Sequence, residues 1–285
     1  MKIAVLSGKG GTGKTFVSVN LAAAAEKAIY VDCDVEEPNG HLFFKPDNLV
    51  QEKVSVMIPQ VNKELCKGCR KCVDFCKFNA LAFIKDKPLV FMDICHSCGG
   101  CILLCPEQAL SEEKKIIGSV QTGTSDQVKV ITGILNTGEA SGVPIIQKLI
   151  KKTFENEGLT IFDCPPGSAC VVMESIKDAD YCILVAEPTV FGAHNLNMVY
   201  ELVNLFGKSC GVVLNKCLEG DNPSEEFCIQ NKLNILKRIP FSTELGTFNS
   251  NAQIAARENQ AYRHLFLSLL RKVAKEVQNE TAVNS

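Results

Sequence analysis

Short apolar runs alternate with amphipathic stretches along most of the chain. The runs with the length of buried strands lie at residues 2–6, 28–31, 128–132, 160–162, 181–186 and 211–214. The stretches with helical spacing of apolar positions lie at residues 16–25, 143–156, 193–206 and 223–231. A strand followed by a helix, repeated in this way, is typical of a parallel sheet covered on both faces. The pattern therefore predicts an α/β fold with a doubly wound, mostly parallel sheet.

This alternation is interrupted after a further expected strand at residues 50–61. Two cysteine runs follow, and they consist of Cys66, Cys69, Cys72 and Cys76, then Cys95, Cys98, Cys101 and Cys105. Each run has the C-x2-C-x2-C-x3-C spacing that is typical of cubane [4Fe-4S] clusters. Between the runs, residues 80–93 predict a hairpin with its turn at 85–88. We therefore expect residues 62–115 to form an insertion within a main domain made of residues 1–61 and 116–285.

The insertion resembles the bacterial ferredoxins that hold two clusters, a small α+β fold. In those ferredoxins the fourth cysteine of each run ligates the other cluster. The resemblance implies one cluster on Cys66, Cys69, Cys72 and Cys105, and another on Cys95, Cys98, Cys101 and Cys76. One departure is Lys77, which follows Cys76, whereas Pro106 follows Cys105. Two zinc ions are the alternative, because zinc also binds sets of four cysteines.

The amino-acid composition limits the cell compartments and the binding partners that we expect for this protein. The 285-residue chain is 46% hydrophobic and carries a formal net charge of −2, without a block of basic residues. We therefore expect no nucleic-acid partner. No apolar stretch approaches the roughly 18 residues of a spanning helix, so we expect a cytoplasmic protein without a membrane partner. In that compartment the 15 cysteines favour metal ligation over disulfides.

The first apolar run leads directly into Gly8-Lys9-Gly10-Gly11-Thr12-Gly13-Lys14-Thr15. The G-x4-G-K-T pattern between a strand and a helix predicts a P-loop. Backbone N–H groups from Gly10 to Gly13 then surround the phosphates of a nucleotide, Lys14 reaches the β- and γ-phosphates, and Thr15 ligates Mg²⁺.

With Lys9 in this loop, the sequence resembles the deviant P-loop of the MinD/Mrp/nitrogenase-iron-protein family of ATPases. In that family the early lysine crosses a dimer interface to the partner's phosphates. The resemblance implies ATP as the nucleotide, and a homodimer or a heterodimer with a paralogous ATPase. It places Lys9 and Lys14 in the catalytic machinery.

Acidic and polar residues at the ends of later strands also match segments of this ATPase family. Asp34 lies in a segment similar to the family's switch I, which implies that it orients the attacking water. Asp163 ends an apolar strand before Pro165-Pro166-Gly167, so we expect it beside Mg²⁺. Asn215 matches the position that recognises adenine, and Pro240 lies in the segment that matches the loop beside that base.

Several further residues leave alternatives open. Glu139 reads as a solvated loop acid or a phosphate-site residue. Cys170 reads as a buried hydrophobe, or as a ligand of a cluster shared across a dimer axis. The remaining cysteines have no ligand spacing and are expected in the core: Cys33, Cys164, Cys182, Cys210, Cys217 and Cys228. The final amphipathic helix, expected at 252–278, favours core packing over a membrane surface.

The sequence thus predicts an ATPase of this family with an inserted ferredoxin segment. The leading hypothesis is ATP-gated electron transfer to a redox partner protein. The alternative is an ATP-dependent carrier or assembly factor that hands metal clusters to a receiving protein. A third interpretation is a positioning ATPase whose clusters are structural or sense redox state.

Overall fold

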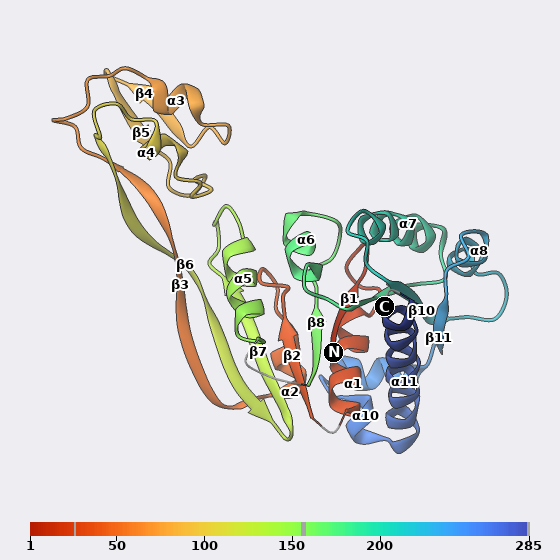
Figure 1. The fold of residues 1–285 in the computed structure, drawn as a ribbon. Coiled ribbons are helices and arrows are strands. Elements are labelled where there is room, and N and C mark those ends of the chain that lie inside the picture. Colours follow the sequence, from red (N-terminus) through yellow and green to blue (C-terminus); the bar gives the residue numbers. More distant parts are fainter. Residues whose placement is uncertain (26, 155–157, 284–285) are drawn as a thin grey trace.

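The computed structural model describes residues 1–25, 27–154 and 158–283, and within them a nine-stranded sheet runs through the centre of the body (Figure 1). The strand order is β11-β10-β9-β1-β8-β2-β7-β6-β3. The strands that pair in parallel are β1 (Lys2–Leu6), β2 (Ala28–Asp32), β7 (Val128–Leu135), β8 (Leu159–Asp163), β9 (Tyr181–Ala186), β10 (Cys210–Cys217) and β11 (Ile235–Pro240). This confirms the predicted mostly parallel α/β sheet.

Helices cover both faces of the sheet because the central strands are apolar on both sides. In β1, Ile3 and Val5 pack in the cluster that contains α1 (Lys14–Ala24), α10 (Ala255–Glu258) and α11 (Gln260–Val283). The alternate residues Ala4 and Leu6 pack in the other cluster. That face carries α5 (Val143–Lys151), α6 (Cys170–Ile176), α7 (Val190–Leu205) and α8 (Pro223–Gln230).

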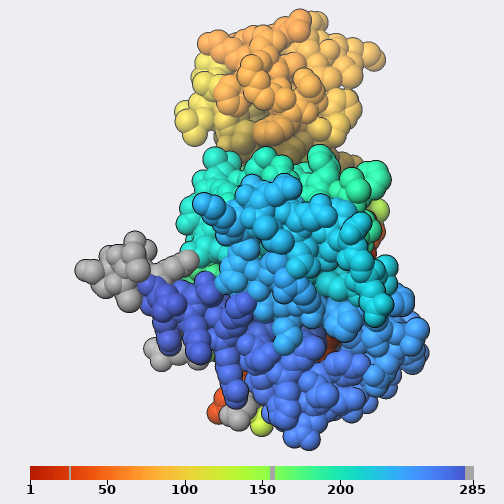
Figure 2. All heavy atoms as spheres, turned by 90° about the vertical axis from the view of Figure 1, so that its right-hand side faces the viewer, coloured from red at the N-terminus to blue at the C-terminus, as the bar shows by residue number. Residues whose placement is uncertain are grey.

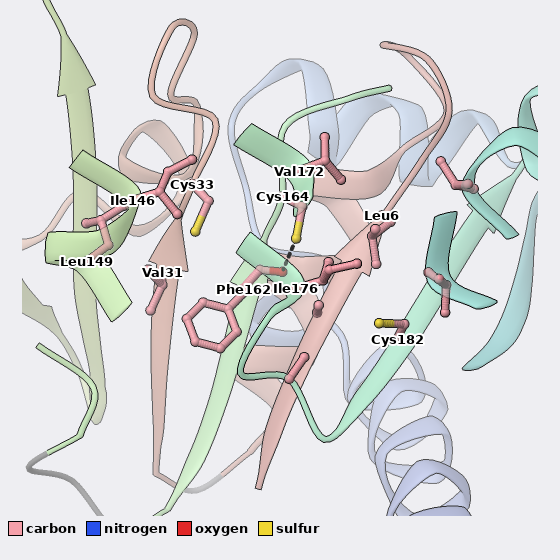
Figure 3. Packing of buried hydrophobic residues seen from close by; sticks show 14 of the residues in the cluster. Leu6, Val31, Cys33, Ile146, Leu149, Phe162, Cys164, Val172, Ile176 and Cys182 are labelled. Carbon is pink, nitrogen blue, oxygen red and sulfur yellow. Dashed lines mark hydrogen bonds between the residues drawn. The ribbon is translucent and has the colours of Figure 1, made fainter. Parts of the chain in front are cut away.

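Several cysteines outside the two runs belong to the hydrophobic core. Figure 3 shows Cys33, Cys164 and Cys182 among the apolar side chains between the sheet and its helices. Cys228 is buried in the same cluster, and Cys210 and Cys217 pack against its edge half-buried. These six residues therefore fill space, as predicted.

A long antiparallel pair of strands forms one edge of the sheet and continues beyond it as an arm. In this pair β3 (Asp47–Val61) runs from Asp47 opposite Thr124 to Val61 opposite Leu110 of β6 (Leu110–Ser125). Pairing of β6 with β7 begins at Gly118, so the outer part of the pair leaves the body. The sequence predicted a strand at 50–61 but missed β6, because charged residues occupy positions 112–115.

The segment between the two arm strands, residues 62–109, forms a separate lobe above the body, which we call the cysteine-rich tip (Figure 2). It contains a hairpin of β4 (Leu81–Ile84) and β5 (Lys87–Val90) where one was predicted. Its short helices are α3 (Lys71–Phe75) and α4 (Gly100–Leu103).

The last part of the chain differs from the single helix expected at 252–278. Two short helices, α9 (Thr243–Ser250) and α10, precede α11, which begins at Gln260. The chain is extended at Asn259, whose side chain accepts from the N–H of Ala261, so the helical run is broken there. The buried face of α11, with Phe266, Leu269 and Val273, confirms the core-packing interpretation.

Two smaller differences concern other helices. The structure adds α2 (Gly40–Phe44), which was not predicted, after the second strand. It ends α5 at Lys151, and the predicted end at residue 156 lies outside the described residues. Among the described residues, no helix combines the length and the apolar character that crossing a membrane requires.

Candidate functional site

The P-loop borders a cleft of about 560 Å³ at the carboxyl ends of the parallel strands. Gly11 and Gly13 have φ angles of 81° and 94°, which favour glycine. A Cβ on Gly13 would lie 2.1 Å from Nδ2 of Asn215, so a side chain has no room there. The cleft brings together most of the predicted nucleotide residues: Lys9, Gly10, Gly11, Gly13, Lys14, Thr15, Asp34, Asn215 and Pro240.

Lys14 lies at the bottom of this cleft against a buried acid. Its Nζ is 2.6 Å from Oδ1 of Asp163 and 4.0 Å from Oδ2 of Asp34. Asp163 also accepts from the hydroxyls of Ser18 at 3.1 Å and Tyr30 at 2.8 Å. Burial alone would lower the pKa of Lys14, but Asp163, with Asp32 and Asp34, holds it above its usual value. The ammonium group is therefore charged and available to a phosphate.

Two further acids lie at the end of β2, where Asp32 is the last residue of the strand and Asp34 follows it. Asp32 accepts from the N–H groups of Asp34 at 3.2 Å and Gly40 at 2.8 Å, so it holds the loop between them. Burial raises the pKa of Asp32 to about 8, and the nearby charge of Asp163 adds to this. Burial also raises the pKa of Asp34 to about 6, against the opposing charge of Lys14. Of Asp32 and Asp34, Asp34 is the one that borders the cleft.

Lys9 makes an ion pair with Glu187, which follows β9. The Glu187 side chain is 15% exposed and the Lys9 side chain 38%. Burial would raise the pKa of Glu187, but the hydrogen bond and charge of Lys9 lower it. The early lysine is thus held within its own chain in this structure.

Residues from β10 tie the P-loop to the far side of the cleft. Asn215 donates from Nδ2 to the carbonyl oxygen of Thr12 at 2.8 Å, and Lys216 donates to that of Gly11 at 2.6 Å. Thr12 itself does not line the cleft. Pro240 is the last residue of β11 and not part of a loop, which corrects the sequence expectation.

Sequence reasoning missed two walls of the cleft. Leu42 and Phe43 of α2 line one side, and Leu245 and Asn249 of α9 line another. A signal for α9 was present, because Ser242 accepts from the N–H of Leu245 as a helix N-cap.

The cysteines of the tip line two small pockets. One is bordered by Cys66, Cys69, Cys72 and Cys105, and the other by Cys76, Cys95, Cys98 and Cys101. Each pocket therefore combines three cysteines of one run with the fourth of the other. Backbone N–H groups also point at sulfurs of the tip: that of Ser97 donates to Cys95 at 3.4 Å, and that of Ala109 donates to Cys105 at 3.3 Å.

The two halves of the tip repeat the same backbone with an offset of 29 residues. Positive φ angles occur at matched pairs of positions: 68 and 97, 70 and 99, and 79 and 108. Asn62 donates to the carbonyl oxygen of Ala109 at 2.8 Å, and Phe91, the equivalent of Asn62, donates to that of Ala80 at 2.8 Å. Residues in such turns direct successive N–H groups into a concave loop, which is common at iron–sulfur sites.

Other sequence candidates lie elsewhere. Cys170 is exposed at the start of α6, so the prediction that it is a buried hydrophobe is wrong. Glu139 is neither solvated nor at the cleft, because its side chain is 11% exposed and pairs with Lys115 at 2.8 Å. Over residues 1–25, 27–154 and 158–283, no three His, Cys, Asp or Glu side chains are grouped to hold one metal ion.

Taken together, a P-loop at the edge of a mostly parallel sheet defines a nucleotide-binding protein of the P-loop class. Residues 3–253 match the family described as the CobQ/CobB/MinD/ParA nucleotide binding domain. The chain belongs to this family. It is 31% identical over 279 residues to the uncharacterized protein MJ0578 of Methanocaldococcus jannaschii, covering 96% of each chain. A second relative, MJ0579 of the same organism, is 29% identical, covering 76% of this chain and 80% of that protein.

Solved structures agree on the fold. The septum site-determining protein MinD with Mg-ADP from Pyrococcus horikoshii has a TM-score of 0.60 at 18% identity, covering 100% of this chain and 98% of that one. The cell division ATPase MinD of Pyrococcus furiosus has a TM-score of 0.60 at 19% identity, covering 96% and 98%.

Proposed function

We propose that this protein is an ATPase that holds two [4Fe-4S] clusters in the cysteine-rich tip and passes electrons to a partner protein under nucleotide control. The observation that carries this proposal is the pair of four-cysteine pockets on a segment joined to a P-loop domain. When bound, the clusters would supply reversible one-electron transfer.

The cysteine thiols of the tip are the donor type that such clusters require, which supports the proposal. Each pocket offers four thiols, and turns with positive φ angles surround both cysteine runs. Hydrogen bonds from N–H groups to the sulfurs of Cys95 and Cys105 would help to set the potentials. Zinc stays the chemical alternative. Metal analysis of anaerobically purified protein separates the two: about eight iron atoms per chain support the clusters, and two zinc ions would contradict them.

The residues of the cleft suit MgATP hydrolysis. We assign Lys14 and the backbone from Gly10 to Gly13 to the phosphates, and Thr15 with Asp163 to Mg²⁺. Asp34 orients the attacking water, and Lys9 acts on the nucleotide of a second protomer. That protomer is another copy or a paralogue.

Nucleotide control is tested with the prereduced protein and an oxidised flavodoxin as acceptor. Electron transfer is followed spectroscopically with MgATP, with MgADP and with a nonhydrolysable ATP analogue. We expect different rates in the three cases. Equal rates would remove the gating claim while leaving the clusters in place.

A second candidate function, a carrier of metal clusters, is favoured by the exposure of Cys170. A four-thiolate site is closed, so a carrier needs another, open site. Iron beyond about eight atoms per chain that transfers to an apo-ferredoxin, and that is lost in Cys170→Ala, would support this function. Unchanged iron content in that variant would exclude it.

The raised pKa of Asp34 predicts a pH dependence of hydrolysis. Asp34 must be ionised to orient water, and its pKa in the nucleotide-free protein is about 6. Because kcat/KM reports groups of the free enzyme, it should rise with pH through a midpoint at about 6 and then reach a plateau. The Asp34→Asn variant should be much slower and lack this step. A wild-type profile that is flat between pH 5 and 7 would contradict the assignment.

The ion pair between Lys9 and Glu187 predicts an effect on dimerisation. Glu187→Gln removes the charge that holds Lys9 within its own chain, so dimers with the ATP analogue should form roughly threefold more tightly. Lys9→Ala should weaken them. Sedimentation velocity measures both, with the exposed Glu219→Gln as the matched control. Weaker dimers in Glu187→Gln would show that this pair supports the interface.

A further inference from the structure

Lys115 lies at the root of the arm. Lys115 is a residue of β6 and pairs with Val56 of β3. The pairing of β6 with β7 begins three residues later, at Gly118. Beyond the main sheet the arm is a two-stranded ribbon, and such ribbons are pliable when nothing else packs on them. A lobe at the end of this ribbon would change its angle to the body unless other contacts fix it.

The Lys115 side chain supplies such contacts, because it joins the tip to the body. Its ammonium group is 2.9 Å from a carboxylate oxygen of Asp93 and 3.2 Å from the carbonyl oxygen of Met92, both in the tip. It is 2.8 Å from a carboxylate oxygen of Glu139, in the loop after β7. These partners use all three donors of the ammonium group.

This cluster of charges is better shielded than an ordinary surface ion pair. The side chains of Lys115 and Glu139 are 17% and 11% exposed, although Asp93 is open to solvent at 81%. Shielding strengthens charge-assisted hydrogen bonds, and three partners fix the ammonium group in one position. Asp93 lies two residues before Cys95, so this contact fixes the start of the second cysteine run.

The Glu139 loop is in turn bound to the segment that follows Asp34. Leu135 donates its N–H to the carbonyl oxygen of Val35 at 2.8 Å. A Cβ on Gly133 or Gly142 would lie 2.7 Å or 2.5 Å from the Val35 side chain, so Val35 packs closely between the two ends of this loop. A displacement of Asp34 and Val35 would therefore require the loop that carries Glu139 to adjust.

We propose that Lys115 is a positioning residue that links the nucleotide cleft to the second cysteine run. It holds the Met92–Asp93 turn against the Glu139 loop, so the angle of the tip follows the position of the segment at Asp34. This proposal rests on the proposed function, because it supplies the structural route by which nucleotide would control electron transfer. Figure 1 shows the chain before α4 coming down toward the loop between β7 and α5.

Hydrogen exchange of the intact protein tests the link without relying on activity. We compare amide exchange in residues 91–101 with MgADP and with the nonhydrolysable ATP analogue. The wild type should differ between the two nucleotides. Lys115→Met keeps the length of the side chain but removes the charge, so it should abolish this difference and speed exchange roughly tenfold in both states. Lys115→Arg should restore much of the wild-type behaviour.

The matched control is Lys114→Met, because the exposed Lys114 is the preceding residue of the same strand. It should behave as the wild type. A nucleotide-dependent difference that persists in Lys115→Met would overturn the proposal, and so would its absence from the wild type or its equal loss in Lys114→Met. Iron content and EPR spectra of the same samples test the clusters separately, so failure of the proposed function is distinguishable from failure of this link.

Discussion

Under the proposed function, replacing Cys105 with serine is expected to remove the cluster that is held mainly by the first cysteine run and to leave the other cluster in place. The reason is that Cys105 lines the pocket of Cys66, Cys69 and Cys72, although it belongs to the second run. Iron content should fall from about eight to about four atoms per chain. The EPR spectrum of the reduced protein should lose the interaction between two nearby clusters.

The equivalent substitution in the first cysteine run tests whether the loss is specific to one cluster. Cys76→Ser should remove the other cluster and give the same iron content with a different remaining EPR spectrum. Cys69→Ser should leave the same spectrum as Cys105→Ser, because both residues line one pocket. If Cys105→Ser instead resembles Cys98→Ser, the fourth cysteine does not cross between halves. ATP binding by each variant shows whether the body remains folded.

Lys14→Met is expected to lower ATP affinity at least about a hundredfold, because it removes the cation at the bottom of the cleft. The same substitution is also expected to lower the stability of the fold. Lys14 offsets the charge of the buried Asp163, so the variant should also lose about 3 kcal/mol of unfolding free energy without nucleotide. Isothermal calorimetry measures the affinity, and denaturant unfolding measures the stability.

Lys216→Met is the matched control for that variant. Lys216 donates to the same loop, at Gly11, but it lies at the exposed edge of the cleft. Its replacement should change ATP affinity only a few-fold, as for a solvated charge. ATP binding by Lys14→Met within about threefold of the wild type would contradict the assignment of Lys14 to the phosphates.

The features that the sequence predicted correctly are those formed by residues close together along the chain. The glycines and Lys14 of the P-loop are neighbours along the chain, and the spacing within each cysteine run is visible in the sequence. Apolar runs located the parallel strands because those strands are buried on both faces. In such regions short stretches of sequence already contain the structural constraint.

The missed parts depend on contacts between residues far apart in the chain. Asn215 binds the carbonyl oxygen of Thr12, and no local pattern indicates that a side chain amide would hold the P-loop. The charged positions 112–115 hid β6, because its outer part projects into solvent with β3 as its partner. The prediction for Glu139 considered only the residues of its own loop, whereas Lys115, on another strand, pairs with its carboxylate.

Closure of the cysteine-rich tip also affects the free energy of the body. The ends of the tip meet where Asn62 donates to Ala109, at the junction with the two arm strands. A disordered loop of several tens of residues between β3 and β6 would cost about 3 kcal/mol of conformational entropy to close. A folded tip removes most of this cost, because it brings the two strands together in register. If the tip holds the proposed clusters, their binding should therefore stabilise the edge of the nucleotide-binding sheet, and their loss should fray that edge first.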